Sequence, residues 1–345
     1  ARELLRGGVE RVFAARRAFA ALAAGGRVVA WGDPGSGGDC SAVEEQLAEG
    51  VVRVYATGSA FAALKADGSV VTWGDAEDGG DSSGVRRQLA SGVEDICGMG
   101  RAFAAVKSSG AVVAWGGVTY GQGAPELRRQ LAEGVRRVFA TEEAFAAVKA
   151  QGSVATWGDR YRGGDSSAVS AALQRGVEHV YSNASAFAAV KSKGAVVTWG
   201  SPSDGGDSSA VRQQIAGGVQ SICATEAAFA ALRRDATVVA WGSPEAGGVN
   251  GAVQLQLRSG VERIYSTDGA FAAVKSDGSV VTWGSRRSGG YSAPVREQLA
   301  GGVHHICSTG HAFAAVKVDG SVVTWGDEGS GGDSCRLREQ LTGVA

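Results

Sequence analysis

The stretch Ala60–Asp75, AFAALKADGSVVTWGD, decides the fold of this chain. It comes back eight times along the 345 residues, and each copy carries one of the eight tryptophans. Neighbouring tryptophans keep a constant spacing of 42 residues: Trp31, Trp73, Trp115, Trp157, Trp199, Trp241, Trp283 and Trp325. A fixed period of this length is the signature of a repeat protein, so the chain is expected to form one repeat domain.

Within this stretch, two apolar runs flank the turn Lys65-Ala66-Asp67-Gly68. Asp-Gly between apolar runs predicts a β-hairpin, because glycine adopts a positive φ without steric cost. The first run is apolar on both faces and rich in alanine, which predicts a strand buried on both sides. In the sixth copy Ala236 replaces the turn glycine. If the backbone is unchanged there, we expect strain of about 1 kcal/mol.

The remainder of each repeat predicts one more strand and a short helix. In the second copy, residues 50–56 alternate between apolar and polar, as a half-buried strand does. Val85 and Leu89 are four residues apart, as on one face of a helix over 84–90, and Gly92 follows its end. The chain is therefore predicted to be mainly β with short helices, with three strands and one short helix in each repeat. The repeats are 8–49, 50–91, 92–133, 134–175, 176–217, 218–259, 260–301 and 302–343, and residues 1–7 match the end of a preceding repeat.

Three segments of the third repeat, 93–98, 102–106 and 110–116, resemble the repeat of the regulator of chromosome condensation (RCC1) family. The recurring pattern WG…GGDSS…QL is most similar to the tandem RCC1-like arrays of dinoflagellates. The resemblance implies a β-propeller, and it implies regulation of a small GTPase or partner recognition within a ubiquitin ligase. The chain departs from the family in having eight repeats instead of seven and a short helix where family blades have a fourth strand. The family's inserted wedge, which acts on a GTPase, has no counterpart, since no loop is longer than its equivalents.

Two arrangements of the repeats stay open. One is a closed propeller of eight blades, and the other is an open β/α superhelical array. Residues 1–7 and 338–342 both resemble helix ends, which gives nine such ends for eight hairpins and suits the open array better. In a closed ring, Cys40 and Cys335 would lie on adjoining blades, and we expect their Cα atoms to be close together.

Composition limits the classes of partner. The net charge is −1, so no overall field attracts nucleic acid or an anionic membrane. No apolar run approaches the roughly 18 residues that a transmembrane helix needs, and the repeats predict a soluble protein. The sequence has no initiator methionine, so we expect a piece of a longer product that lacks its targeting segment. The compartment, whether cytoplasm or an organelle, is left open.

The sequence does not predict catalytic, cofactor or metal chemistry. Gly-Gly-Asp-Ser-Ser at 79–83 could bind an anion before a helix, but it recurs in many repeats and reads as a helix cap. Cys97, Cys223 and Cys307 share one strand position with aromatic residues, which indicates core packing. His304, His305 and His311 surround Cys307 in the sequence, yet a core cysteine argues against a metal site there. Asn183-Ala184-Ser185 is a glycosylation sequon that matters only in a secreted chain.

A basic residue precedes the hairpin turn in seven repeats, as Lys65 does in the second. Stacked repeats would align these residues in a ladder. The favoured interpretation is that they solvate the strand ends and discourage edge-to-edge pairing.

The three residues between the first strand and the hairpin vary most, apart from the loop after the tryptophan. A constant core with variable loops is typical of scaffolds that bind other proteins. The charged members of these loops are the predicted partner-binding residues: Arg16, Arg17, Arg101, Glu142, Glu143, Glu226, Asp268 and His311. On a closed ring they would form one basic and one acidic arc. We therefore expect a non-catalytic interaction scaffold or a structural subunit of a larger assembly, with protein partners; the alternative is the RCC1-like regulatory module.

Overall fold

The computed structural model describes residues 8–117, 125–249 and 251–334. Residues 1–7, which were predicted to match the end of a preceding repeat, lie outside the described residues. Cys335 also lies outside them, so the predicted proximity of Cys40 and Cys335 stays a prediction. The chain divides into two compact units, Ala1–Gly176 and Val177–Ala345, called here unit 1 and unit 2. The division falls one residue from the predicted border of the fourth and fifth repeats. Closure of the eight repeats into a ring stays a prediction.

Each repeat forms one three-stranded antiparallel sheet with its strands in sequence order, as predicted. The strands of unit 1 are β1 (Val9–Ala14), β2 (Ala18–Ala23), β3 (Arg27–Gly32), β4 (Val51–Ala56), β5 (Ala60–Lys65), β6 (Val70–Gly74), β7 (Val93–Met99), β8 (Ala102–Lys107), β9 (Val112–Gly116), β10 (Val135–Ala140), β11 (Ala144–Lys149) and β12 (Val154–Gly158). Those of unit 2 are β13 (Val177–Ser182), β14 (Ala186–Lys191), β15 (Val196–Gly200), β16 (Val219–Ala224), β17 (Ala228–Arg233), β18 (Val238–Gly242), β19 (Val261–Ser266), β20 (Ala270–Lys275), β21 (Val280–Gly284), β22 (Val303–Ser308), β23 (Ala312–Lys317) and β24 (Val322–Gly326). The fold is thus a mainly β repeat protein of eight sheets.

The helical segments are short. Those of unit 1 are η2 (Pro34–Ser36), η3 (Ser41–Val43), η4 (Ala76–Gly80), η5 (Ser83–Val85), α1 (Pro125–Gln130), η6 (Arg160–Arg162) and η7 (Ser167–Leu173). Those of unit 2 are η8 (Ser192–Gly194), η9 (Pro202–Gly206), η10 (Ser209–Val211), η11 (Pro244–Ala246), η12 (Gly251–Val253), η13 (Gln256–Arg258), η14 (Arg286–Ser288), η15 (Ala293–Val295) and η16 (Glu328–Ser330).

The predicted helix over 84–90 is a turn of 3₁₀-helix followed by further turns, and α1 of the third repeat is the α-helix of the described residues. The apolar spacing was nevertheless interpreted correctly, because Leu89 is buried and Val85 packs against the same core. The reason for the difference is length: a segment of this size gains too few i→i−4 hydrogen bonds to offset helix nucleation. The Val85 carbonyl shows the mixed character of this segment, because it accepts from two amides. The Gln88 amide bonds it at 3₁₀ spacing, and the Leu89 amide bonds it at α-helical spacing.

The middle strand of each sheet is buried on both faces, as its sequence predicts. In β5, residues Ala60 to Ala63 have no exposed surface. Small side chains on this strand allow a neighbouring sheet to approach closely, so the sheets of each unit stack with their first strands in contact. The hydrophobic core is therefore a series of interfaces, each shared by two consecutive repeats.

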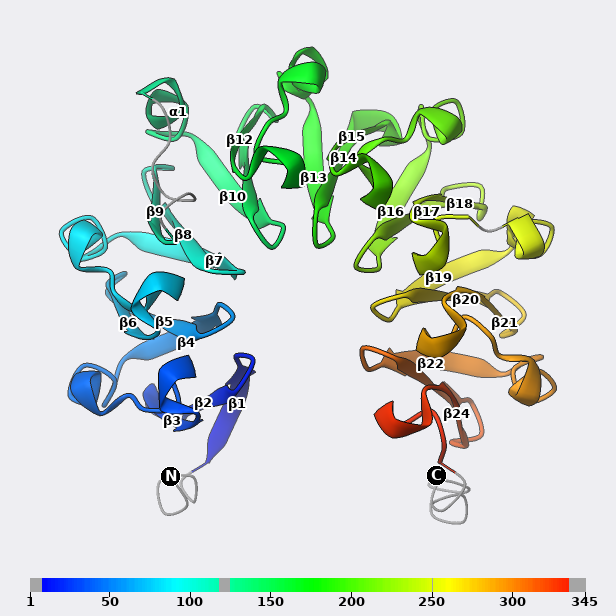
Figure 1. The fold of residues 1–345 in the computed structure, drawn as a ribbon, viewed down its shortest axis with the longest axis horizontal. Coiled ribbons are helices and arrows are strands. Elements are labelled where there is room, and N and C mark those ends of the chain that lie inside the picture. The colour runs from blue at the N-terminus through cyan, green and yellow to red at the C-terminus, as the bar shows by residue number, and fades with distance from the viewer. Residues whose placement is uncertain (1–7, 118–124, 250, 335–345) are drawn as a thin grey trace. The chain divides into compact units, whose positions relative to one another are not determined.

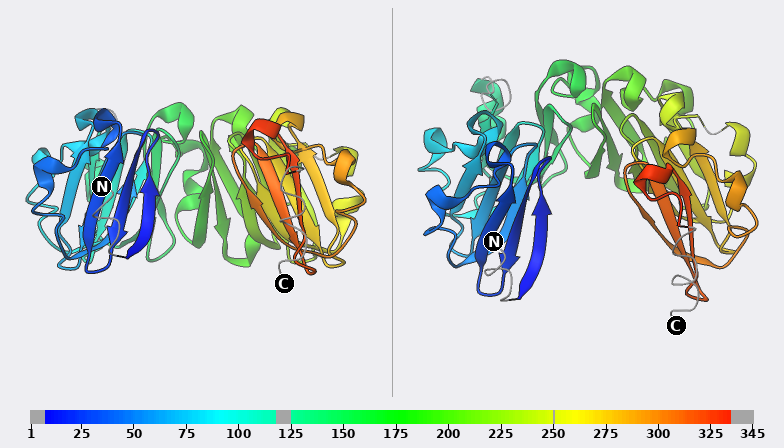
Figure 2. Two further views of the ribbon diagram at one scale, coloured as in Figure 1. Left: turned by 90° about the horizontal axis from the view of Figure 1, so that it is seen from below. Right: turned by 60° about the horizontal axis from the view of Figure 1, so that its bottom comes forward.

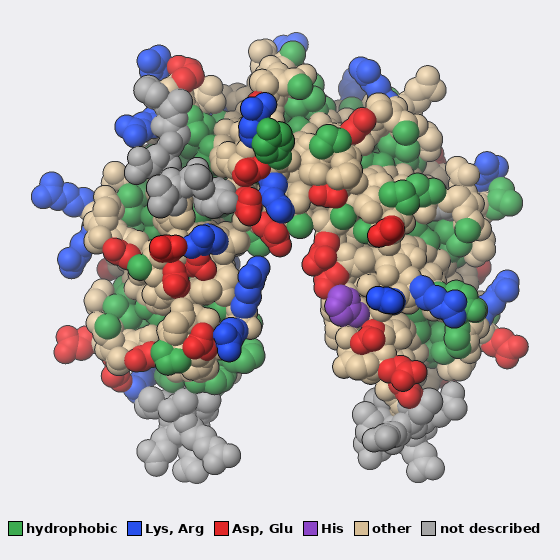
Figure 3. All heavy atoms as spheres, in the orientation of Figure 1, with side chains coloured by type: hydrophobic (Ala, Val, Ile, Leu, Met, Phe, Trp, Pro, Cys, Tyr) green, Lys and Arg blue, Asp and Glu red, His purple; other side chains and the backbone are tan. Residues whose placement is uncertain are grey.

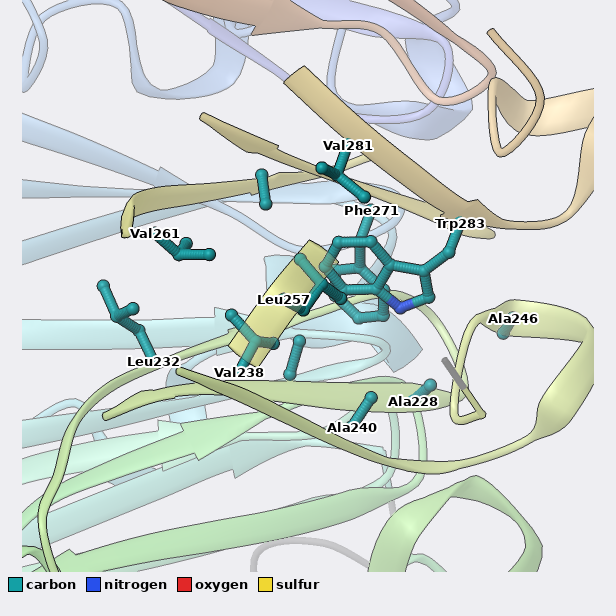
Figure 4. Close-up of a cluster of buried hydrophobic side chains, with 12 residues drawn as sticks. Ala228, Leu232, Val238, Ala240, Ala246, Leu257, Val261, Phe271, Val281 and Trp283 are labelled. Atoms are coloured by element: carbon teal, nitrogen blue, oxygen red, sulfur yellow. The ribbon is translucent and has the colours of Figure 1, made fainter. Parts of the chain in front are cut away.

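One such interface joins the sixth and seventh repeats (Figure 4). Phe271 and Trp283 of the seventh repeat stack with ring centroids 5.2 Å apart and lie over Ala228 and Ala240 of the sixth. The indole Nε1 of Trp283 donates to the Gly247 carbonyl of the sixth repeat at 3.0 Å.

Gly247 has φ 91°, and a Cβ added there would be 2.8 Å from the Phe271 ring. Glycine is required here because the aromatic ring occupies the space of a side chain. The same glycine–phenylalanine contact recurs at Gly37–Phe61, Gly79–Phe103, Gly205–Phe229 and Gly289–Phe313.

The tryptophans are buried packing residues, as predicted: Trp73, Trp115, Trp157, Trp199, Trp241, Trp283 and Trp325 are each 3–5% exposed. Trp31 of the first sheet is only partly buried. The turn at Ala236 keeps the repeat's backbone, with φ 60°, so the predicted left-handed alanine is confirmed.

The basic residues before the hairpin turn bridge consecutive repeats. Lys65 Nζ donates to the Gln46 carbonyl of the preceding repeat at 2.9 Å. Lys107, Lys149 and Lys317 make the equivalent bond to Gln88, Gln130 and Gln298. The interpretation that they only solvate the strand ends was therefore incomplete, because a lysine can bond the last carbonyls of a helical turn.

Candidate protein-interaction surface

The antiparallel sheets bring both variable loops of a repeat to the same end. The chain leaves the first strand through the tip loop, such as Thr57–Ser59, and leaves the third strand through the post-Trp loop, such as Asp75–Asp78. In an antiparallel sheet of three strands these two connections share one end, and the hairpin turn lies at the other. We call the end with the two variable loops the loop face and the other end the hairpin face. Figure 2 shows the strands of each sheet running side by side between these two ends.

A buried side chain fastens the two loops together. Thr57 is 6% exposed, and its Oγ1 donates to the Asp78 carbonyl at 3.0 Å while accepting from the Ala60 amide at 3.0 Å. The Asp75 amide also donates to the Ser59 carbonyl. Thr141, Thr225, Thr267 and Thr309 make the same bond from tip loop to post-Trp loop. The variable loops therefore form one surface with a defined geometry.

Asn183 takes the threonine's place in the fifth repeat. Its Nδ2 donates to the Asp204 carbonyl at 2.6 Å, and its Oδ1 accepts from the amides of Ser185 and Ala186. Asn183 is 8% exposed. The amide nitrogen of the sequon is thus engaged inside the loop face and is a structural group of the fold.

Backbone hydrogen bonds join the tip loops of consecutive repeats into a row. In unit 1 the Arg16 amide donates to the Gly58 carbonyl, and the Gly58 amide donates to the Gly100 carbonyl, at 3.0 and 2.9 Å. In unit 2 the bonds run from Ala184 to Glu226, from Glu226 to Asp268 and from Asp268 to Gly310. The middle residues of these bonded tip loops are therefore held at a fixed spacing from one another within each unit, so a partner would meet an ordered row of side chains there.

Several of the predicted partner-binding charges are paired on this face. Arg101 donates to Asp78 and to Glu77 of the preceding post-Trp loop, with both distances 2.6 Å. These two carboxylates raise the pKa of the Arg101 guanidinium, Asp78 more than Glu77. Glu142 and Glu143 both lie 3.4 Å from Arg162 of their own post-Trp loop.

Other predicted charges differ in their surroundings. His311 Nδ1 lies 4.0 Å from Asp268 and 3.5 Å from the hydroxyl of Ser288. Glu226 is exposed. Arg16 and Arg17 are exposed and have no carboxylate partner among the residues that the structure describes. On the face seen in Figure 3, acidic and basic side chains lie next to one another within each unit.

Sequence reasoning missed the partners of these charges. Glu77, Asp78 and Arg162 belong to the post-Trp loops, which the sequence analysis treated separately from the tip loops. The signal was present, because a sheet of three antiparallel strands places the two loops at one end. A comparison of equivalent loops between repeats does not reveal it, because the contacts join loops of different kinds.

The Gly-Gly-Asp-Ser-Ser segment has a structural role. Asp81 Oδ1 accepts from the Ser83 amide at 2.8 Å, and the Ser82 hydroxyl lies 2.9 Å from the Thr72 hydroxyl of the third strand. The bond from the Ser83 amide lowers the pKa of the Asp81 carboxyl. The segment thus turns the chain and fixes it to the sheet. The helix-cap interpretation was wrong for Ser82, because its side chain makes no cap bond at the start of η5.

The described cysteine and histidine residues do not form one cluster. Burial raises the pKa of the Cys97 thiol to about 12. Cys307 is exposed, so its assignment to the core was wrong; it lies on the last sheet of the described chain, where no following sheet covers that position. His305 Nδ1 lies 3.2 Å from the Tyr265 hydroxyl. Within the described residues, no three His, Cys, Asp or Glu side chains are placed to hold a metal ion.

The hollows of the surface lie between consecutive repeats. One of 550 Å³ in unit 2 is lined by Pro202, Val211, Trp241, Pro244 and Val249, with Asp207 as its charged residue. The Asp207 carboxylate already accepts from the Ser209 amide, which lowers its pKa. This hollow therefore offers apolar contact without a free acid or base.

No protein-family model matches the chain, and no curated protein matches it. Among solved structures, the chain is similar to Prp20p from Saccharomyces cerevisiae, with 13% identity over 94% of this chain and 84% of that one and a TM-score of 0.43. The yeast RCC1 (Prp20) bound to Kap60 matches with 15% identity over 70% and 71% of the two chains, at a TM-score of 0.41. The ectodomain of the Physcomitrella patens receptor kinase CR4 matches with 13% identity over 78% and 70%, at 0.40. In the described part of the chain, no helix is long and apolar enough to cross a membrane.

Proposed function

We propose that the chain is a non-catalytic scaffold whose loop face binds a protein partner, as a structural or recruiting subunit of a larger assembly. The observation that carries the proposal is the convergence of both variable loops of each repeat on one end of its sheet. A surface that recognises a partner needs side chains that vary and a loop backbone whose geometry stays the same. The loop face has both, since Thr57 and its equivalents fix the loops while the residues around them change.

The opposite end supports the proposal by contrast. On the hairpin face, the same basic side chain bonds the same carbonyl in repeat after repeat, as Lys65, Lys107 and Lys149 do. Such uniformity serves the stacking of repeats. Variation on the loop face is not needed for stacking, so it is available for binding.

Arg16 and Arg17 offer the sharpest test, because they are exposed and have no carboxylate partner among the described residues. The experiment captures partners from the native source on the immobilised wild-type chain and on Arg16→Glu/Arg17→Glu. The matched control is Arg86→Glu/Arg87→Glu, which makes the same charge change on exposed residues of the turn after η5.

A partner that docks on the loop face is recovered by the wild type and by the control, and the loop variant binds it about tenfold or more weakly, with a smaller salt dependence. Equal recovery on all three proteins overturns the proposed role of these arginines. Capture of a small GTPase in the same experiment would identify the RCC1-like regulatory role instead of the scaffold.

A further inference from the structure

The outer edge of β18, the third strand of the sixth repeat, carries backbone groups that are free to pair. Its sheet has the order β16-β17-β18, so no described strand lies on the far side of β18. The Thr237 carbonyl accepts from the Arg233 amide and therefore points towards β17. Because antiparallel strands alternate between bonded and non-bonded residues, the amides and carbonyls of Val238 and Ala240 point away from β17. They have no hydrogen-bond partner among the described residues.

The second repeat shows how the chain itself can close this edge. There the Val70 amide, at the start of the third strand, donates to the Leu89 carbonyl of the helical segment at 3.0 Å. Val238 and Leu257 are the equivalent residues of the sixth repeat, yet no such bond joins them. The outer edge of β18 is therefore open to a further strand from its first residue onward.

Two substitutions in the sixth repeat remove bonds that fasten the following segment elsewhere. The Thr72 hydroxyl bonds a carbonyl of that segment at 2.9 Å, whereas Ala240 at the equivalent position has no hydroxyl. Asp207 accepts from the Ser209 amide, whereas Val249 in its place has no acceptor and is 60% exposed. The sixth repeat thus gives up two bonds and gains an exposed apolar side chain, a departure that is typical of functional sites.

The open edge borders the apolar hollow of 550 Å³ described above, and residues 238–242 of β18 line it. Its other lining residues come from two consecutive repeats, with Pro202 and Val211 from the fifth and Pro244 and Val249 from the sixth. A site of this size is within the range of those that bind ligands, about 300–1,000 Å³. Side chains of an extended segment alternate between its two sides. Apolar side chains on either side of such a segment would therefore find apolar contacts.

We propose that the outer edge of β18 binds an extended apolar segment of a partner protein, which adds to the sheet beside this strand. The open amides and carbonyls of Val238 and Ala240 require an extended backbone, because only such a chain pairs with donors and acceptors along an edge. Strand addition gains affinity from these main-chain bonds and specificity from pockets for alternate side chains. The site lies along the strand, so it does not depend on the proposed binding at the loop face.

A peptide and its two N-methylated forms test the proposal on the whole chain. The fluorescently labelled probe has the core Val-Thr-Val-Val between pairs of lysines, which keep it soluble. Methylation of alternate amides blocks one hydrogen-bonding edge of the peptide and retains every side chain. By fluorescence anisotropy the unmethylated probe should bind, one methylated form should lose binding, and the form methylated on the other edge should keep it. Any other pattern overturns the proposal, and equal binding of all three peptides would show apolar adsorption without backbone pairing.

Two variants of the sixth repeat locate the site. Val249→Asp should raise the Kd of the probe about tenfold or more, because the bound peptide would desolvate a carboxylate that has no partner. The variant should fold, since Asp207 occupies this position in the fifth repeat. Leu255→Asp is the matched control, with the same charge change at a residue that is 77% exposed and does not line the hollow. Its Kd should not rise, and an equal rise for both variants overturns the proposal.

Amide exchange reports on the strand itself. Binding of the unmethylated probe should slow exchange of the Val238 and Ala240 amides, read by NMR on the isotope-labelled chain. The amides of Val280 and Thr282, at the equivalent positions of the seventh repeat, are the internal control and should be unchanged. Here the chain closes its own edge, because the Val280 amide already donates to the Leu299 carbonyl. Unchanged exchange at Val238 and Ala240 with the probe bound overturns the proposal.

Discussion

Removal of Trp115 should destabilise unit 1 strongly, because this side chain combines packing with an inter-repeat hydrogen bond. It is 5% exposed, and its ring centroid lies 5.2 Å from that of Phe103. Its Nε1 donates to the Gly79 carbonyl of the preceding repeat at 3.0 Å. Truncation of a buried aromatic side chain to alanine costs about 3–5 kcal/mol. Of this, the lost hydrogen bond contributes roughly 1 kcal/mol.

Urea denaturation followed by circular dichroism measures the effect. With a slope of about 3 kcal/mol per molar urea, Trp115→Ala should lower the midpoint by roughly 1 M. Trp115→Phe retains most of the ring packing and should recover more than half of the loss. Trp31→Ala is the matched control at low protein concentration, since Trp31 is the partly buried equivalent in the same unit. A Trp115→Ala midpoint equal to that of the wild type, or a Trp31→Ala loss as large, would contradict this role of Trp115.

Three further predictions concern single residues. Ala236→Gly should raise the free energy of unfolding by about 1 kcal/mol, because it relieves the left-handed alanine; a lower thermal midpoint than the wild type's would contradict this. Asn183→Asp should lower the thermal midpoint, since it removes the Nδ2 donor that bonds the Asp204 carbonyl, and an unchanged midpoint would show that this bond does not stabilise the loop face. Cys97, which is only partly exposed and has its pKa raised to about 12, should react with iodoacetamide much more slowly than the exposed Cys307 at pH 8, and equal rates would contradict this. Because folding raises this pKa, the thiol's contribution to stability is complete below about pH 8.5 and is lost as the pH rises towards 12.

Much of the fold follows from the repeated stretch alone. The Asp-Gly turn predicts β5 and β6, and the alanine-rich run predicts a strand buried on both faces. The short helix was less predictable, because Val85 and Leu89 also fit a 3₁₀ turn with the same buried face. Periodicity identifies which residues are buried, but it does not distinguish these two backbones over so few residues.

The placement of the tip loops could be predicted in part, while binding at their charged residues stays a prediction. The variable tip loops do form a row on one end of the sheets, and Arg16 and Arg17 are exposed there. What the sequence left out is contact between loops, such as that of Arg101 with Asp78. These residues belong to different repeats and to different loops, so no single period relates them. The exposure of Cys307 could not be predicted from its position in the repeat. Cys97 and Cys223 share that position, but a following sheet covers them, and no following sheet covers Cys307 in the described part of the chain.

The proposed function requires that a protein partner docks on the loop face. Hydrogen exchange of the chain with and without its captured partner tests this most directly, because the loop face and the hairpin face of every sheet are reported in one experiment. Docking there predicts slower exchange in the tip loops and post-Trp loops of consecutive repeats, such as residues 57–59 and 75–78, with no change at the hairpin turns, such as residues 66–68. Protection at the hairpin turns, with the loops unchanged, would contradict it.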